Sequence, residues 1–99
     1  MRLSQQQVGA IGRTFNKFFV HGNVVLFGSR VDDAKKGGDI DVYIEPNQQF
    51  DDLFSRKVAF LVELKSLIGD QKIDLVLAPF ASADLKAEIA RTGVTLWQN

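Results

Sequence analysis

The sequence contains no cysteine. This absence excludes a disulfide scaffold, a thiolate zinc site and a cysteine nucleophile, and it is compatible with a reducing cytoplasm. The first residues lack the apolar run of a signal peptide. No stretch approaches the ~18 consecutive apolar residues of a membrane-spanning helix. We therefore expect a soluble, cytoplasmic protein that does not act at a membrane.

The sequence also lacks an excess of charge of either sign, because 12 basic and 12 acidic residues cancel. A neutral chain does not attract nucleic acid over long range, so direct nucleic-acid binding is not expected as the main role. Apolar and aromatic residues make up 45% of the 99 residues, which is enough for one core. We expect a single domain over residues 1–99.

The apolar pattern predicts alternating helices and strands. Helical spacing predicts helices over residues 4–19, 51–68 and 82–92. Their expected N-caps are Ser4, Asp51 or Asp52, and Ser82. Strand patterns cover residues 23–27, 39–45, 72–77 and 94–97. This order predicts an α+β (α/β) fold with a mixed sheet of about four strands and helices packed on one face.

The predicted helix that ends at Ile68 carries more apolar residues than one buried face requires. The extra apolar side chains either fill the core or form a binding surface for a partner. The sequence supports both interpretations equally.

Two aspartates, Asp39 and Asp41, lie in the second predicted strand. Residues two apart share one face of a strand and lie about 6.6 Å apart along the backbone. At an effective dielectric of ~20 their repulsion is roughly 2.5 kcal/mol, so a cation is a natural partner. Mg²⁺ prefers such oxygen ligands and keeps coordination sites for phosphate and water. The alternative is a solvated strand face, on which acidic pairs are common.

The Gly28-Ser29 pair directly follows the first predicted strand. Glycine lets the backbone turn sharply and approach a ligand closely. The following amides and the Ser29 hydroxyl can then donate hydrogen bonds to phosphate oxygens. The alternative is an ordinary turn at the end of a strand.

A third acidic residue, Asp74, lies in an otherwise apolar strand, on the face away from the core. If this strand lies beside the strand of Asp39 and Asp41, the three carboxylates converge. They can then hold two Mg²⁺ ions, or one ion while one carboxylate serves as general base. The alternative is an edge charge that discourages aggregation.

Together, Gly28-Ser29, the Asp39-Ile40-Asp41 strand and Asp74 resemble the motif of polymerase-β-like nucleotidyltransferases. In length and order the chain is similar to the minimal nucleotidyltransferases (MNT), the small subunits that pair with a helical HEPN protein in toxin–antitoxin modules. The resemblance covers Val24 to Leu77 well and the two ends loosely. It implies the polymerase-β-like fold and a nucleoside triphosphate as substrate.

The resemblance also implies roles for the turn. Gly28 and Ser29 would bind the β- and γ-phosphates, and Arg30 would pair with phosphate. One departure is Gly38, where many family members carry serine before the first aspartate. A glycine there removes no metal ligand but alters the loop.

The same resemblance implies that Asp39, Asp41 and Asp74 are the catalytic metal ligands. Asp39 and Asp41 would bind Mg²⁺, and Asp74 would bind one ion and help to activate the acceptor hydroxyl. The implied reaction transfers AMP from ATP to a tyrosine of a partner HEPN toxin, silencing its RNase activity, so that the chain acts as antitoxin. The alternatives are a non-catalytic antitoxin that neutralises by binding, and a homodimeric transferase acting on a small molecule.

The roles of several other residues stay open in the sequence. Lys35 and Lys36 either contact phosphate or form a solvated charge run. Tyr43 either lines the base or acceptor pocket or is a plain strand tyrosine. His21 is interpreted as structural or solvated rather than catalytic, and Trp97 as a packing residue.

Overall fold

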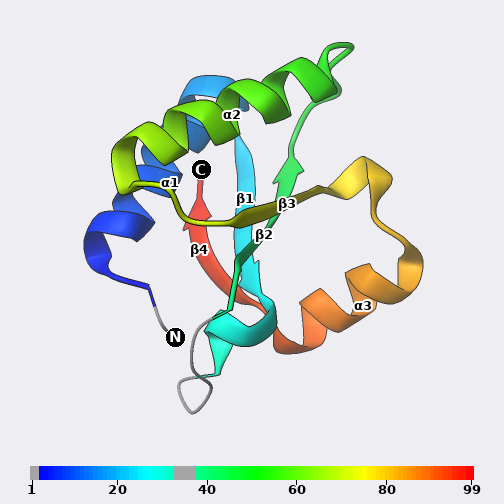
Figure 1. Cartoon of the computed structure of the whole chain (residues 1–99). Helices are drawn as coiled ribbons and strands as arrows, with labels where there is room; N and C mark the ends of the chain where they lie inside the picture. Colours follow the sequence, from blue (N-terminus) through cyan, green and yellow to red (C-terminus); the bar gives the residue numbers. More distant parts are fainter. Residues whose placement is uncertain (1–2, 33–37) are drawn as a thin grey trace.

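The computed structural model describes residues 3–32 and 38–99. Over these residues the chain forms three α-helices, four strands and two short 3₁₀ turns (Figure 1). In chain order they are α1 (Gln5–Phe18), β1 (Gly22–Phe27), η1 (Gly28–Val31), β2 (Ile40–Pro46), α2 (Leu53–Ile68), β3 (Ile73–Leu77), η2 (Ala78–Phe80), α3 (Ala83–Thr92) and β4 (Val94–Gln98). The predicted order of helices and strands is confirmed.

The four strands form one sheet in the order β3-β2-β1-β4. β1 is antiparallel to both of its neighbours, β2 and β4, whereas β2 and β3 are parallel. The sheet is therefore mixed, and the predicted fold class is confirmed.

One face of the sheet packs against α1 and α2. Every second side chain of the central strands points to this side, as the period of a strand requires, and Val24, Leu26, Val42 and Ile44 are fully buried there. The two helices cover them with apolar side chains that include Ile11, Phe15, Phe60 and Leu64. This layer is the main core of the molecule.

The third helix corrects one detail of the prediction, because α3 packs against the opposite face of the sheet. Its Ile89 is buried there with Tyr43 and Ala78, and Figure 1 shows α3 apart from α1 and α2. The reason is the handedness of the connections. The chain crosses from β2 to β3 through α2 and then back to β4 through α3, so right-handed crossovers put the two helices on opposite faces.

Local signals explain where the helices begin. Ser4 caps α1 in a reciprocal capping box with Gln7, and Ser82 accepts a hydrogen bond from the backbone N–H of Leu85 at the start of α3. Asp52 occupies the N-cap position of α2 but makes no side-chain cap. Its carboxylate instead accepts a hydrogen bond from Arg56 Nε at 2.8 Å.

The last strand is fixed to the first helix through Trp97. A Cβ atom at Gly12 would lie 2.2 Å from the Trp97 ring, so only glycine lets the ring sit on α1. Trp97 Nε1 also donates to Asn16 Oδ1 at 3.1 Å. Trp97 is thus a packing residue. No helix in the described ranges is long and apolar enough to cross a membrane.

Candidate active site

The parallel pairing of β2 with β3 brings two of the predicted carboxylates side by side. Asp41 and Asp74 are direct partners in the register of the two strands. Neighbouring strands lie roughly 4.8 Å apart, so the two side chains lie close together. Both residues alternate with buried apolar neighbours, so their carboxylates lie on the face opposite the main core.

Burial and the neighbouring acidic groups raise the pKa of Asp41 above its ordinary value of 3.8. Burial is the largest cause, followed by the negative charges of Asp74 and Asp39 and the hydrogen bond to Asp74, while Lys72 partly offsets the shift. A carboxylate held in this way favours a bound proton or cation.

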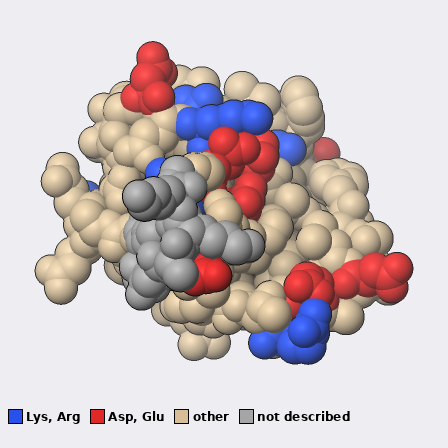
Figure 2. Space-filling model, turned by 60° about the horizontal axis from the view of Figure 1, so that its bottom comes forward, with Lys and Arg blue, Asp and Glu red and all other residues tan. Residues whose placement is uncertain are grey.

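Asp39 lies just before β2 and does not join the other two carboxylates. Its Oδ2 is 3.4 Å from Lys72 Nζ, at the point where the backbone N–H of Ile40 donates to the Lys72 carbonyl. Within residues 3–32 and 38–99, no three acidic, histidine or cysteine side chains are grouped closely enough to hold a metal ion. Figure 2 shows acidic side chains beside basic ones on the face where β2 begins.

The turn after β1 passes directly against Asp41. Phe27, the last residue of β1, is the register partner of Asp41. Gly28 follows with φ of +76°, and a Cβ atom at this position would lie 2.3 Å from Asp41 Oδ2. The left-handed backbone therefore favours glycine, and a side chain at this position would displace the Asp41 carboxylate.

The Ser29 hydroxyl lies beside the segment that leads to Asp39. Gly38 has φ of +90°, and a Cβ atom there would lie 2.1 Å from Ser29 Oγ. Arg30 Nε donates to the Gly38 carbonyl at 3.4 Å. The glycine that departs from the common family pattern is thus favoured by its own backbone, and a side chain there would displace the Ser29 hydroxyl. Lys35 and Lys36 lie outside the described residues.

Two cavities flank the paired carboxylates. One, of about 470 Å³, runs along the edge strand β3 and is lined by Asp41, Asp74 and Leu85, with Lys57 of α2. The other, of about 380 Å³, lies between the η1 turn and α3, and Ser29 is among the residues that line it.

The helix α3 contributes to the walls of both cavities, through Leu85 in the first and through Glu88 and Thr92 in the second. Sequence reasoning missed these wall residues because it placed all helices on one face. The handedness of the crossover connections was the signal that could have revealed them.

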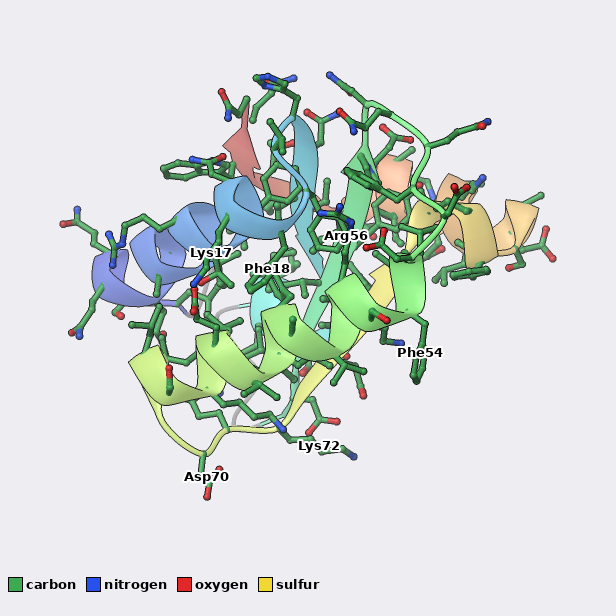
Figure 3. The ribbon with its side chains drawn as sticks, turned by 90° about the horizontal axis from the view of Figure 1, so that it is seen from above. Lys17, Phe18, Phe54, Arg56, Asp70 and Lys72 are labelled. Carbon is green, nitrogen blue, oxygen red and sulfur yellow. The ribbon has the colours of Figure 1, made fainter. Side chains whose placement is uncertain are left out.

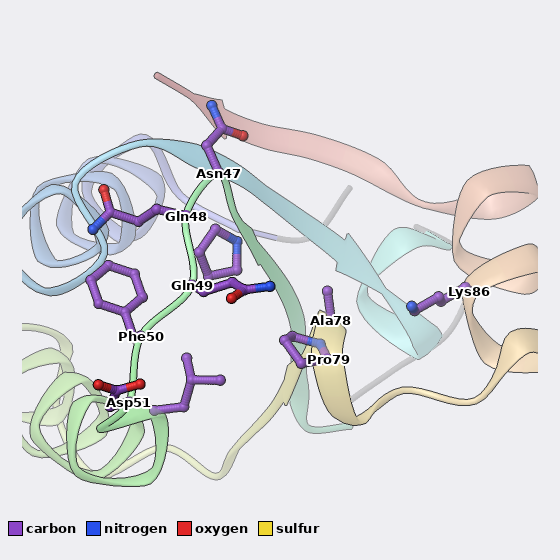
Figure 4. Close-up of a pocket in the computed structure, with 10 residues that line it drawn as sticks. Asn47, Gln48, Gln49, Phe50, Asp51, Ala78, Pro79 and Lys86 are labelled. Atoms are coloured by element: carbon purple, nitrogen blue, oxygen red, sulfur yellow. The ribbon is translucent and has the colours of Figure 1, made fainter.

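A further cavity of about 490 Å³ lies at the other end of the parallel strands (Figure 4). Its lining includes Pro46, Gln49, Phe50 and Pro79. Pro46 is five residues beyond Asp41, or roughly 16 Å along a strand. The paired carboxylates therefore lie at the opposite end of the sheet from this cavity.

Tyr43 lies in a buried cluster and His21 lies at the surface. Tyr43 is buried beneath α3, and burial, followed by the charge of Glu45, raises its pKa. His21 is exposed, and its backbone joins Phe19 and Asn47 through hydrogen bonds. Tyr43 also lines a cavity of about 370 Å³ beside α3, so both alternatives for Tyr43 stay open, and the interpretation of His21 stays a prediction.

The comparison with protein families matches this arrangement. The family model described as "Polymerase beta, Nucleotidyltransferase" matches residues 11–99. The chain belongs to the polymerase-β nucleotidyltransferase family. A search of curated proteins found no match.

Solved structures show the same fold. The chain is 22% identical, with a TM-score of 0.73, to a chain of the tri-AMPylated Shewanella oneidensis HEPN toxin in complex with MNT antitoxin, covering 98% of this chain and 74% of that one. A toxin–antitoxin structure with AMP-PNP has a TM-score of 0.75 at 22% identity, covering 93% and 73%. A mutant MntA-HpeT toxin–antitoxin has a TM-score of 0.73 at 20% identity over the same shares, 93% and 73%.

Proposed function

We propose that this chain is a Mg²⁺-dependent nucleotidyltransferase that transfers AMP from ATP to a tyrosine hydroxyl of a HEPN toxin, and so acts as its antitoxin in the cytoplasm. The observation that carries this proposal is the register pairing of Asp41 with Asp74 beside the Gly28 turn. Within a nucleotidyltransferase fold, we assign Asp41 and Asp74 as metal ligands and the turn at Gly28 as the phosphate-binding element.

In this proposal, two of the described carboxylates supply ligands to a divalent cation. Asp41 and Asp74 are register partners with carboxylate oxygens. Burial, followed by the charge of Asp74, raises the pKa of Asp41. Asp39 would become a third ligand by leaving Lys72, an exposed lysine whose contact is loose at 3.4 Å. Bound Mg²⁺ would supply neutralisation of charge on the phosphates.

The chain's own residues have separate tasks in this proposal. The Ser29 hydroxyl and the turn amides donate to phosphate oxygens, and Arg30 pairs with phosphate charge. Asp74, which is exposed, accepts the proton of the tyrosine hydroxyl. The bond from the tyrosine oxygen to the α-phosphorus forms as the bond from that phosphorus to the pyrophosphate oxygen breaks, and pyrophosphate leaves.

The structural neighbours support the choice of nucleotide and acceptor. One is a complex whose HEPN toxin is tri-AMPylated, and another contains AMP-PNP. An adenine nucleotide and a HEPN acceptor are therefore the first substrates to test for this chain.

The test incubates the chain with α-labelled ATP, Mg²⁺ and the HEPN protein that we expect the adjacent gene to encode. The wild type is expected to label the HEPN protein, and Asp39→Asn is expected to abolish labelling. Asp70→Asn is the matched control, because Asp70 is exposed in the turn after α2. Equal labelling by the wild type and Asp39→Asn would contradict the enzymatic proposal, as would the lack of a HEPN gene beside this one.

The ion pair between Asp39 and Lys72 favours a second candidate function, a non-catalytic antitoxin. In that case the chain neutralises the toxin by binding alone, and its acidic residues are residual. Growth of cells that express the toxin distinguishes the two functions. Rescue by both the wild type and Asp39→Asn, with no label transferred by either, would favour the binding protein.

A further inference from the structure

A row of apolar side chains lies exposed along α2. Phe54, Val58 and Val62 are 74%, 45% and 67% exposed. Residues four apart follow one another along the same side of a helix. Figure 3 shows Phe54 projecting from α2 on the side away from α1. Contiguous exposed apolar side chains of this kind mark interaction surfaces.

This row borders the cavity that contains the candidate catalytic carboxylates. Leu61, one turn from Val58 and adjacent to Val62 in sequence, lines the same cavity of about 470 Å³ as Asp41 and Asp74. A partner that covers the row therefore lies next to the edge strand β3 and within reach of the two carboxylates.

The charges around the row are basic. Lys57 and Lys65 form no ion pair with any residue in the described part of the chain. The acidic residue Glu63 pairs with Lys17 of α1 at 2.6 Å. Lys72, which pairs with Asp39 at 3.4 Å, lies on the same side of α2 as Phe54 (Figure 3). The surface thus combines apolar side chains with the positive charges of Lys57 and Lys65, which pair with no carboxylate in the described part of the chain.

A second copy of this chain is a poor occupant, since lysines would face lysines across a symmetric contact. The complementary occupant is an amphipathic helix with an apolar stripe flanked by carboxylates. The 16 residues of α2 span roughly 24 Å, which is long enough for helix-on-helix packing.

We propose that the α2 face formed by Phe54, Val58, Leu61 and Val62 docks an acid-flanked amphipathic helix of the acceptor protein. Docking there presents the acceptor hydroxyl across β3 to Asp41 and Asp74. The proposal rests on the proposed function, because it assumes that the acceptor is a protein.

The test measures binding of the neighbouring HEPN protein by calorimetry. The double variant F54S/V62S is expected to weaken binding about tenfold or more, because buried aromatic anchors dominate interface energies. The matched control is Phe80→Ser, since Phe80 is equally exposed at 72% but lies in η2. The control is expected to bind within about twofold of the wild type. Both variants replace exposed side chains, and Mg-ATP binding reports that each remains folded.

Charge reversal tests the second part of the proposal. Lys57→Glu combined with Lys65→Glu is expected to weaken binding further, and the affinity of the wild type is expected to fall as salt rises. Equal binding by F54S/V62S and the wild type would overturn the docking surface. So would formation of a homodimer by the wild type that F54S/V62S abolishes.

A catalytic variant separates this proposal from the proposed function. Asp74→Asn is expected to bind the HEPN protein like the wild type and to transfer no label. If the wild type labels its partner while F54S/V62S binds and labels equally well, the docking surface is wrong and the proposed function stands. If the wild type transfers no label but its binding depends on Phe54 and Val62, the docking surface stands and the enzymatic proposal is wrong.

Discussion

On β2, Val42 and Ile44 point toward α1 and α2 and are fully buried, whereas Asp41 and Tyr43 point to the opposite face. The same division holds on β3, where Leu75 is buried and Asp74 is exposed. The period of two along a strand thus separates the residues that stabilise the fold from the residues proposed to do chemistry. Substitutions on one face can therefore test function while those on the other test stability.

The two faces also differ in how completely they are covered. The helices α1 and α2 cover the sheet face that forms the main core. The helix α3 covers only part of the other face, through Leu85 and Ile89. The uncovered part is where Asp41 and Asp74 line a cavity. The thinner cover leaves room for a ligand between the carboxylates and α3.

The largest expected effect is on the sheet face that α3 covers only in part. We predict that Asp74→Asn lowers the rate of AMP transfer on the order of a thousandfold, since charge stabilisation at a metal site is worth several kcal/mol. Thermal unfolding is expected to change little, because Asp74 is exposed. Transfer of labelled AMP and the melting temperature are measured on the same sample. A large loss of stability would contradict the separation of the two faces.

The second largest effect is expected on the sheet face that α1 and α2 cover. We predict that Ile44→Ala lowers the free energy of unfolding by about 2–5 kcal/mol, because a fully buried side chain leaves a cavity. Ile44→Val, which removes one methyl group, is expected to cost about 0.5–1.5 kcal/mol. Urea denaturation gives both values. The folded fraction of Ile44→Val is expected to transfer AMP at the wild-type rate, and a slower rate would show that the faces are coupled.

A smaller effect tests the contact between the turn and the site. We predict that Gly28→Ala costs about 1–2 kcal/mol in backbone strain at φ of +76° and also weakens Mg-ATP binding, because the added Cβ displaces Asp41. Gly69→Ala is the matched control, with φ of +92° and no atom within 4 Å of its Cβ. It is expected to lose similar stability and keep nucleotide binding. Equal nucleotide affinity in the two variants would contradict the role given to Gly28.

The smallest effect concerns pH. The pKa of Asp41 in the folded protein is raised above its ordinary value of 3.8. At pH values between 3.8 and the raised pKa, the folded state therefore binds more protons than the unfolded state. The protonated Asp41 carboxyl therefore stabilises the folded state at low pH, and this stabilisation is lost as pH rises through the raised pKa. In EDTA, Asp41→Asn is expected to gain in melting temperature relative to the wild type as pH rises through the raised pKa of Asp41. A difference in melting temperature between Asp41→Asn and the wild type that does not change with pH would contradict a raised pKa of Asp41.

The sequence predicted which residues share a face, because alternation of apolar and acidic residues along β2 and β3 is a local signal. It did not predict that Asp41 lies opposite Asp74. That register depends on how α2 and the connecting turns place β3, which no local pattern encodes. The side on which α3 packs was also missed, although the handedness of crossovers contains that information.

The surroundings of Asp39 and Gly38 could not be predicted for a different reason. The ion pair of Asp39 with Lys72 joins residues far apart in sequence and depends on side-chain conformation at the surface. The preference for glycine at position 38 follows from its positive φ and from Ser29 Oγ, which only the folded turn brings together.

Calorimetric titration with Mg-ATP tests most directly whether the paired carboxylates form a metal–nucleotide site. The wild type is expected to bind one Mg-ATP per chain, with little binding when EDTA removes the metal. Asp41→Asn is expected to lose at least about tenfold in affinity, because it removes a charged ligand, while Asp70→Asn keeps wild-type affinity. Unchanged Mg-ATP binding by Asp41→Asn, or no binding by the wild type, would contradict the account.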